Sequence, residues 1–136
     1  MIEAPPETAS TLAALFSGWR ITEMDLWDQE AIDLVEPAFI EFAGQGGHFR
    51  FIAVEGWMEC RHKERNRRPY VEFTWEGNDE CDPAGGRGWA RLEKDGSLNG
   101  RIYIHHGDDS GFKAIPFGEE AKPSPGTSVN AKRGRR

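Results

Sequence analysis

Apolar and polar residues alternate along most of the chain with a period of two, the pattern of β-strands that bury one face. The segment 70–76 shows this most clearly, because Val71, Phe73 and Trp75 share one face. The same alternation predicts strands over 19–28, 38–43, 48–61, 88–93, 98–105 and 112–117. The residues predicted to point inward are apolar: Trp19, Ile21, Phe49, Phe51, Val71, Phe73, Trp75, Ala90, Leu92, Ile102 and Ile104.

Two positions depart from simple alternation. In the first strand, the face that contains Trp19 and Ile21 gives way after Glu23 to a face that contains Met24. This switch predicts a bulge or a bend. Gly56 lies inside the longest predicted strand, where a glycine favours a bend.

The clearest hairpin lies within 89–114. The dipeptide Asp95-Gly96 separates two alternating segments, and Asp-Gly is a strong hairpin signal because glycine adopts positive φ at little cost. In a type I′ turn Gly96 has positive φ, and the turn fixes the register of the strands on either side. The second of these strands leads directly into a polar cluster that begins at His105.

Seven predicted strands joined by short, glycine-rich turns favour an all-β antiparallel meander. An open sheet of this size exposes two edges, so we expect it to close into a small barrel of seven or eight strands. Segments 63–68 and 77–87 are predicted loops, and 29–36 is a linker with a possible helical turn. The expected organisation is a leader with one short helix over 1–17, a β-barrel domain over 18–118 and a disordered basic tail over 119–136.

Charge is distributed unevenly. Residues 1–121 carry 12 basic and 23 acidic side chains, a formal charge of −11, whereas residues 122–136 carry five basic and no acidic side chains. An acidic body repels phosphate groups, so nucleic acid is a poor partner for the folded part.

Several classes of protein do not fit the sequence. No apolar run approaches the roughly 20 residues of a membrane-spanning helix, and the first residues lack the basic region of a signal peptide. The two cysteines, Cys60 and Cys81, are too few for a disulfide framework or a zinc cage. We therefore expect a cytoplasmic protein with reduced cysteines and no membrane partner.

A predicted helix followed by Gly18-Trp19 at the start of a meander resembles the lipocalin-like (calycin) barrels, in which a Gly-x-Trp motif opens the first strand. Here the glycine and the tryptophan are adjacent. The stretches GWRITEMDLWD and FTWEGNDECDPAGGRGWARLEKDGSLNGRIYIHHGDDSGFKA, within 18–114, look like a group of uncharacterised bacterial proteins. The first resemblance implies that Trp19 is buried at the barrel floor. The second implies a bacterial, cytoplasmic protein, and neither implies an activity.

The densest polar cluster contains His105, His106, Asp108 and Asp109. Two imidazoles and two carboxylates can bind a divalent metal or transfer protons. Neighbouring side chains on a strand point to opposite faces, so the two histidines converge only if the chain turns at Gly107. A strand-ending turn is favoured over a binding site, and a binding site over a metal or catalytic site, and we expect no tight metal binding.

Glu23 is a second candidate. If it shares the inward face with the apolar residues of its strand, it needs a partner such as Arg91, or its pKa rises. A carboxylate beside Phe73 and Trp75 would orient a small ligand. The alternative is that Glu23 lies in water at the barrel mouth.

Two charged segments are interpreted as solvated surface. The acidic segment 76–82 lacks the spacing of a calcium loop, and the basic segment 61–68 lacks the interleaved aromatic residues of a single-strand nucleic-acid binder. The sequence also contains no nucleophile elbow, no phosphate-binding glycine loop and no C-x-x-C motif.

These patterns favour a non-enzymatic barrel that binds a small ligand or a protein partner, without a cofactor. The candidate ligand-binding residues are Glu23, Phe73, Trp75, Arg91, His106, Asp108 and Asp109. One alternative is an interaction module of a bacterial regulatory or defence system, and another is a weakly metal-dependent enzyme at the rim 105–109. A hollow barrel favours ligand binding, whereas a filled barrel with an exposed apolar patch favours an interaction module.

Overall fold

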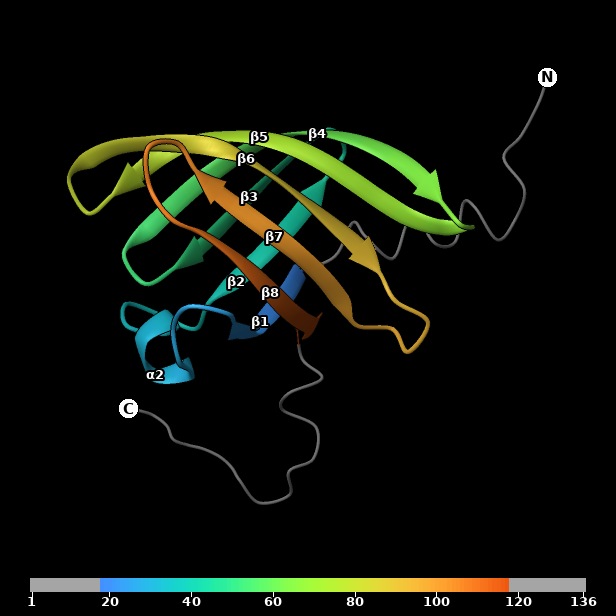
Figure 1. The fold of residues 1–136 in the computed structure, drawn as a ribbon, viewed down its shortest axis with the longest axis horizontal. Helices are drawn as coiled ribbons and strands as arrows, with labels where there is room; N and C mark the ends of the chain where they lie inside the picture. Colours follow the sequence, from blue (N-terminus) through green and yellow to red (C-terminus); the bar gives the residue numbers. More distant parts are fainter. Residues whose placement is uncertain (1–17, 118–136) are drawn as a thin grey trace, which may run out of the picture.

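The computed structural model describes residues 18–117, so the expected leader helix and basic tail lie outside the described residues. Eight antiparallel strands form a closed barrel in which each strand pairs with its neighbours in sequence and β8 pairs with β1 (Figure 1). The predicted all-β antiparallel barrel is thus confirmed. The elements are β1 (Gly18–Met24), α2 (Gln29–Ile32), β2 (Phe39–Ala43), β3 (Gly46–Phe51), β4 (Val54–Arg65), β5 (Arg68–Asp79), β6 (Asp82–Leu92), β7 (Leu98–Ile104) and β8 (Asp109–Pro116).

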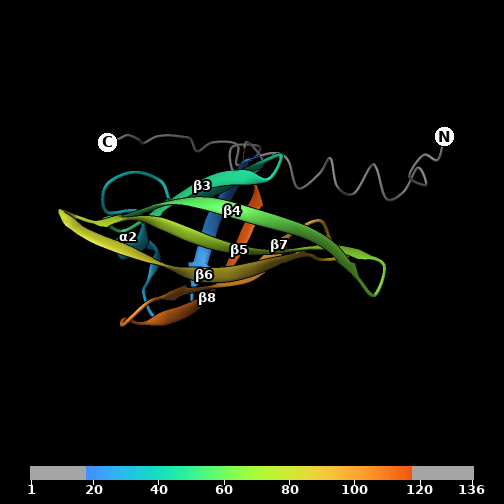
Figure 2. The ribbon, with the colours of Figure 1, turned by 90° about the horizontal axis from the view of Figure 1, so that it is seen from above.

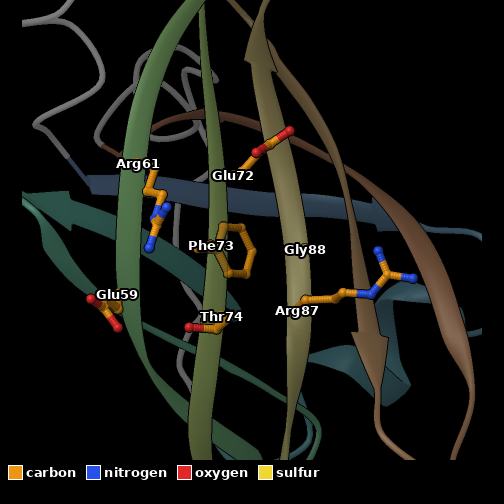
Figure 3. Close-up of a pocket in the computed structure, with 7 residues that line it drawn as sticks. All are labelled: Glu59, Arg61, Glu72, Phe73, Thr74, Arg87 and Gly88. Carbon is orange, nitrogen blue, oxygen red and sulfur yellow. The ribbon is translucent and has the colours of Figure 1, made fainter.

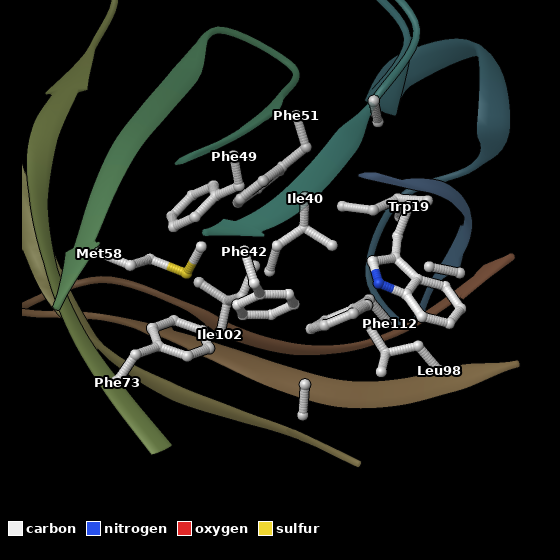
Figure 4. Packing of buried hydrophobic residues seen from close by; sticks show 14 of the residues in the cluster. Trp19, Ile40, Phe42, Phe49, Phe51, Met58, Phe73, Leu98, Ile102 and Phe112 are labelled. Atoms are coloured by element: carbon white, nitrogen blue, oxygen red, sulfur yellow. The ribbon is translucent and has the colours of Figure 1, made fainter. Parts of the chain in front are cut away.

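Apolar side chains from all eight strands fill the barrel (Figure 4). Every residue predicted to point inward is buried except Leu92 and Ile104, which pack against the margin of the core. Trp19 is only 2 % exposed, as expected. The centroid of the Phe49 ring of β3 lies 5.1 Å from that of Trp75 of β5, so rings meet across the intervening strand.

Gly56 of β4 allows these rings to meet. A Cβ at this position would lie 2.5 Å from Cζ of Phe49 and 2.7 Å from Cε3 of Trp75, closer than real Cβ atoms approach. Gly88 of β6 is covered in the same way by the Phe73 ring, whose Cζ would lie 2.5 Å from an added Cβ. The inward-facing glycines of the long strands thus make room for aromatic rings of their neighbours.

The prediction of one strand over 48–61 is wrong, because the chain reverses at Ile52-Ala53 between β3 and β4. Ile52 has a φ of 55°, which is rare for a β-branched residue. Its N–H donates to the carbonyl oxygen of Ile32 in α2 at 2.8 Å, and this contact stabilises the turn. The apolar run 51–54 contains none of the usual turn residues, so no residue there indicates a turn.

The predicted loops 63–68 and 77–87 are also wrong, because both belong largely to strands. Strands β4 and β5 join at Asn66-Arg67, both with positive φ, and β5 and β6 join at a turn in which Glu80 has a φ of 58°. Strands β4, β5 and β6 are therefore 11 or 12 residues long and extend beyond the shorter strands at both ends (Figures 1 and 2).

The predicted bulge in β1 is confirmed by a register shift between Ile21 and Glu23. The shift turns Met24 inward, where it is buried, and leaves Glu23 exposed. Glu23 therefore does not share the inward face with Trp19, and its carboxylate lies outside the core.

Gly96 has a φ of +89°, in agreement with the expected hairpin turn between β6 and β7. The turn is not type I′, because Lys94 and Asp95 do not have positive φ. Instead, the N–H of Gly96 donates to the carbonyl of Glu93 at 3.0 Å, and the backbone N–H of Glu93 donates to the carbonyl of Ser97 at 2.8 Å.

Asp33 holds the α2 segment against the barrel. Its two carboxylate oxygens accept hydrogen bonds from the Arg20 guanidinium at 2.9 and 2.8 Å, and from the backbone of Ala38 and the amide of Gln29. Burial by itself raises the pKa of Asp33, but these hydrogen bonds outweigh it and hold the pKa below its usual 3.8. The adjacent Ile32 is fully buried at the barrel end.

Candidate binding groove on the outer face

Three adjoining depressions hollow the outer face of the long strands, with volumes of about 360, 460 and 800 Å³. The first two share Thr74 and Arg87, and the second and third share Glu76, Gly85 and His105. They therefore form one groove along β5 and β6, which we call the outer groove. All three depressions are open to solvent, so the outer groove is a feature of the surface and not an enclosed pocket.

Gly85 lowers the floor of this groove. It lies opposite Glu76 in the register of β5 and β6, at an outward-facing position where most residues would project a side chain. The N–H of His105 donates to the carbonyl of Gly85 at 2.7 Å, which places the turn between β7 and β8 beside it. Gly85 therefore lies between Glu76 and His105, and it has no side chain to fill the space between them.

One end of the groove, the mixed-charge end, carries both signs of charge (Figure 3). Its lining comprises Glu59, Arg61, Glu72, Phe73, Thr74, Arg87 and Gly88. The Arg87 guanidinium lies 4.5 Å from the centre of the Tyr103 ring, so its charge is directed towards β7. Glu72 pairs with Lys63 at 3.1 Å, whereas Arg61 forms no ion pair within residues 18–117.

The other end, the aromatic end, is lined by Trp57, Glu76, Gly77, Pro83, Ala84, Gly85, His105 and His106. The Trp57 indole is 51 % exposed and lies directly opposite Glu76 in the register of β4 and β5. It stacks on His48, with ring centres 5.1 Å apart and planes 16° from parallel. Nε2 of His48 is in turn 2.7 Å from a carboxylate oxygen of Glu55. The indole is therefore supported from one side and open to the groove.

The two histidines converge because the chain turns there, as the sequence allowed. The N–H of Gly107 donates to the carbonyl of Ile104 at 2.8 Å, and the N–H of Ile104 donates to that of Asp108 at 3.0 Å. His106 has a φ of 62°, and the rings of His105 and His106 lie 4.0 Å apart. The favoured strand-ending turn is therefore present, and it brings both imidazoles to the aromatic end.

The structure does not bring the seven candidate ligand-binding residues together. Phe73 and Trp75 are each 3 % exposed and have their rings in the core. The Trp75 indole N–H donates to the carbonyl of Tyr103 at 3.2 Å. Of the remaining candidates, His106 lines the outer groove and Asp108 is exposed in the turn that follows it.

Glu23 and Arg91 line a separate depression of about 330 Å³ over β1, β8, β7 and β6. They form no ion pair with each other, because Arg91 pairs with Glu93 at 2.8 Å. Asp109 is held by Arg101 at 2.7 Å on the same outer face. These charged residues are therefore surface groups rather than parts of a pocket inside the barrel.

Sequence reasoning missed Trp57 and Gly85, the two residues that shape the aromatic end. Trp57 occupies a position of β4 between the inward-facing Gly56 and Met58, so alternation alone assigns its side chain to the outer face. A tryptophan on a polar face indicates a candidate binding residue, but this face of β4 can be assigned only once the turn at Ile52 is known.

No group of three or more His, Cys, Asp or Glu residues within 18–117 is arranged to hold a metal ion. Cys60 and Cys81 are both free thiols, and burial raises the pKa of Cys60 to about 11. The helix described in this part of the chain is too short to cross a membrane. A comparison with known proteins finds no matching protein family, no similar characterised protein and no similar solved structure.

Proposed function

We propose that this protein is a non-enzymatic binding protein that takes its ligand or partner in the outer groove. The observation that carries this proposal is the continuity of three depressions along β5 and β6, with an exposed indole at one end. The barrel interior offers a poor alternative, because large apolar side chains from all eight strands occupy it. The free thiols of Cys60 and Cys81 support a cytoplasmic location.

A second candidate function is an interaction module that uses the α2 end of the barrel. Leu26, Leu34 and Val35, next to α2, are 51 %, 67 % and 55 % exposed. Clustered exposed apolar side chains are typical of protein interfaces. This second function uses a different surface from the outer groove, so mapping the bound surface distinguishes the two proposals.

Amide chemical-shift mapping with phenol and N-methylacetamide as probes tests the proposal. We expect shift changes at 74–76 and 84–87, and weaker changes in a Gly85→Val variant, in which the added side chain fills the groove. Ala43→Val adds bulk to an exposed position on β2, away from the groove, and serves as the control. Shift changes confined to Ile40 and Leu98 in the core, or to residues 26–35, would contradict the proposal.

If the Gly85→Val chain does not fold, a second variant tests the proposal. Trp57→Ala removes an exposed side chain and preserves the backbone, and it should weaken the phenol-induced shifts at 84–87. Unchanged shifts in Trp57→Ala would contradict the proposal.

A further inference from the structure

We propose that the aromatic end of the outer groove binds an arginine side chain of a partner polypeptide. This inference rests on the proposed binding function and assigns the chemistry of one part of its surface. It follows from the exposed indole of Trp57, from the carboxylate of Glu76, which has no ion pair within residues 18–117, and from a lining that contains no lysine or arginine.

Trp57 supplies the first part of the recognition. A planar guanidinium stacks well on an indole, and the attraction grows when water is excluded. The His48 ring covers one side of the indole and holds its orientation, and Glu55 holds His48. The platform is therefore fixed before a partner arrives, which lowers the entropic cost of binding.

Glu76 supplies the second part. It lies directly opposite Trp57, and side chains paired in this way have Cβ atoms about 5 Å apart. One guanidinium can therefore contact the indole and the carboxylate at once. Glu76 forms no ion pair or hydrogen bond with another side chain in residues 18–117, so its charge is free to pair.

The charge around the aromatic end selects against other ligands. The adjacent turn between β5 and β6 carries Asp79, Glu80 and Asp82, none of which forms an ion pair within residues 18–117. An anion would be repelled here, and a neutral apolar group would cover Glu76 without pairing with it. A cation satisfies both the indole and the carboxylate.

The open shape of this end favours a side chain on a polypeptide over a small free cation. Its volume is about 800 Å³, and it continues into the rest of the groove through Glu76, Gly85 and His105. A groove that follows two strands has room for an extended segment on the side of the bound arginine that leads towards the mixed-charge end. Its far end carries both signs of charge and so sets no strong requirement on the neighbouring residues.

Calorimetry with acetyl-Gly-Arg-Gly-Arg-Gly-amide tests the proposal, with citrulline in place of each arginine in the matched peptide. Citrulline has nearly the same shape as arginine but carries no positive charge. The arginine peptide should bind about tenfold more tightly, the scale of a partly desolvated cation–π contact with a carboxylate partner. Added salt should weaken it, because both partners are charged.

Variants of the full chain locate the contact. Trp57→Ala and Glu76→Gln should each weaken binding of the arginine peptide about fivefold or more, and Trp57→Phe should restore most of the loss. Glu30→Gln on α2 and Phe117→Ala, both at exposed positions away from the groove, should leave it unchanged.

Equal affinity for the two peptides, or no effect of Trp57→Ala and Glu76→Gln, would overturn the inference. Tighter binding of a peptide with aspartate in place of arginine would also overturn it. If phenol still maps to 74–76 and 84–87 in these cases, the outer groove remains the binding surface and only the assignment to arginine fails.

Discussion

On the inner face of β4–β6, Gly56 and Gly88 are covered by the rings of Phe49 and Phe73, whereas on the outer face no ring atom lies within 4 Å of the Cβ position of Gly85. Glycines on these strands therefore have different surroundings on the two faces of the sheet. Inside, an unfilled gap loses dispersion contacts and costs stability, so neighbouring rings fill it. Outside, the space above Gly85 is open to solvent, so a ligand can occupy it without displacing a side chain. The groove exists because this gap faces solvent.

Two tryptophans give the largest contrast between the faces. Trp19→Ala removes an indole that is 2 % exposed and should cost about 3–5 kcal/mol of unfolding free energy. Trp57→Ala removes one that is 51 % exposed and should cost less than about 1 kcal/mol. Denaturant unfolding of both variants measures the difference. A loss below about 1 kcal/mol for Trp19→Ala would show that the core does not depend on its indole.

Two glycines of β6 test the contrast at the scale of one methyl group. A Cβ at Gly88 would lie 2.5 Å from the Phe73 ring and 2.6 Å from the carbonyl oxygen of Arg101, so Gly88→Ala should cost about 1–3 kcal/mol. A Cβ at Gly85 meets nothing closer than a backbone oxygen at 3.0 Å, so Gly85→Ala should cost less than about 1 kcal/mol. Equal losses in thermal or denaturant unfolding would remove the distinction between the two faces.

The hairpin turn between β6 and β7 sets the register of β7. Strand β7 leads into the turn that contains His106, so the hairpin also positions this part of the groove. Gly96 has a φ of +89°, and Gly96→Val should destabilise by about 1–3 kcal/mol. A change in register should disturb amide signals of Ile102, Ile104 and His106 together. Unchanged stability and unchanged signals over 98–110 would show that this turn does not position the wall of the groove.

Much of the fold was readable from alternation, because a closed barrel buries one face of each strand. The turn at Ile52 was not readable, since a contact with Ile32 of α2 and not a turn residue stabilises it. The aromatic end was less accessible still. It depends on Gly85 lying beside His105, which requires the register of β6 and the position of the turn after β7. Alternation describes faces of strands and says little about which outward-facing residues become neighbours.

Asp33, beside α2, is a paired carboxylate, in contrast with Glu76, which forms no ion pair within residues 18–117. Asp33 is paired with Arg20, and its pKa is lowered, so it contributes stability that is present above about pH 4 and is lost as the pH falls further. Asp33→Asn should cost about 1–2 kcal/mol at neutral pH and should flatten this part of the pH dependence. Unfolding measured from pH 7 to pH 3 checks the result. An unchanged acid profile would show that the contacts of Asp33 with Arg20 and Ala38 contribute nothing to stability.

The most direct test of a filled interior and an open outer face is methyl NMR of the full chain under xenon pressure. Xenon enters empty apolar cavities and leaves well-packed cores unaffected. The account predicts no saturable shifts for the methyl groups of Ile40, Leu98 and Ile102, which are at most 1 % exposed in the barrel. Saturable shifts of these methyl groups would reveal a cavity inside the barrel and contradict the assignment of binding to the outer groove.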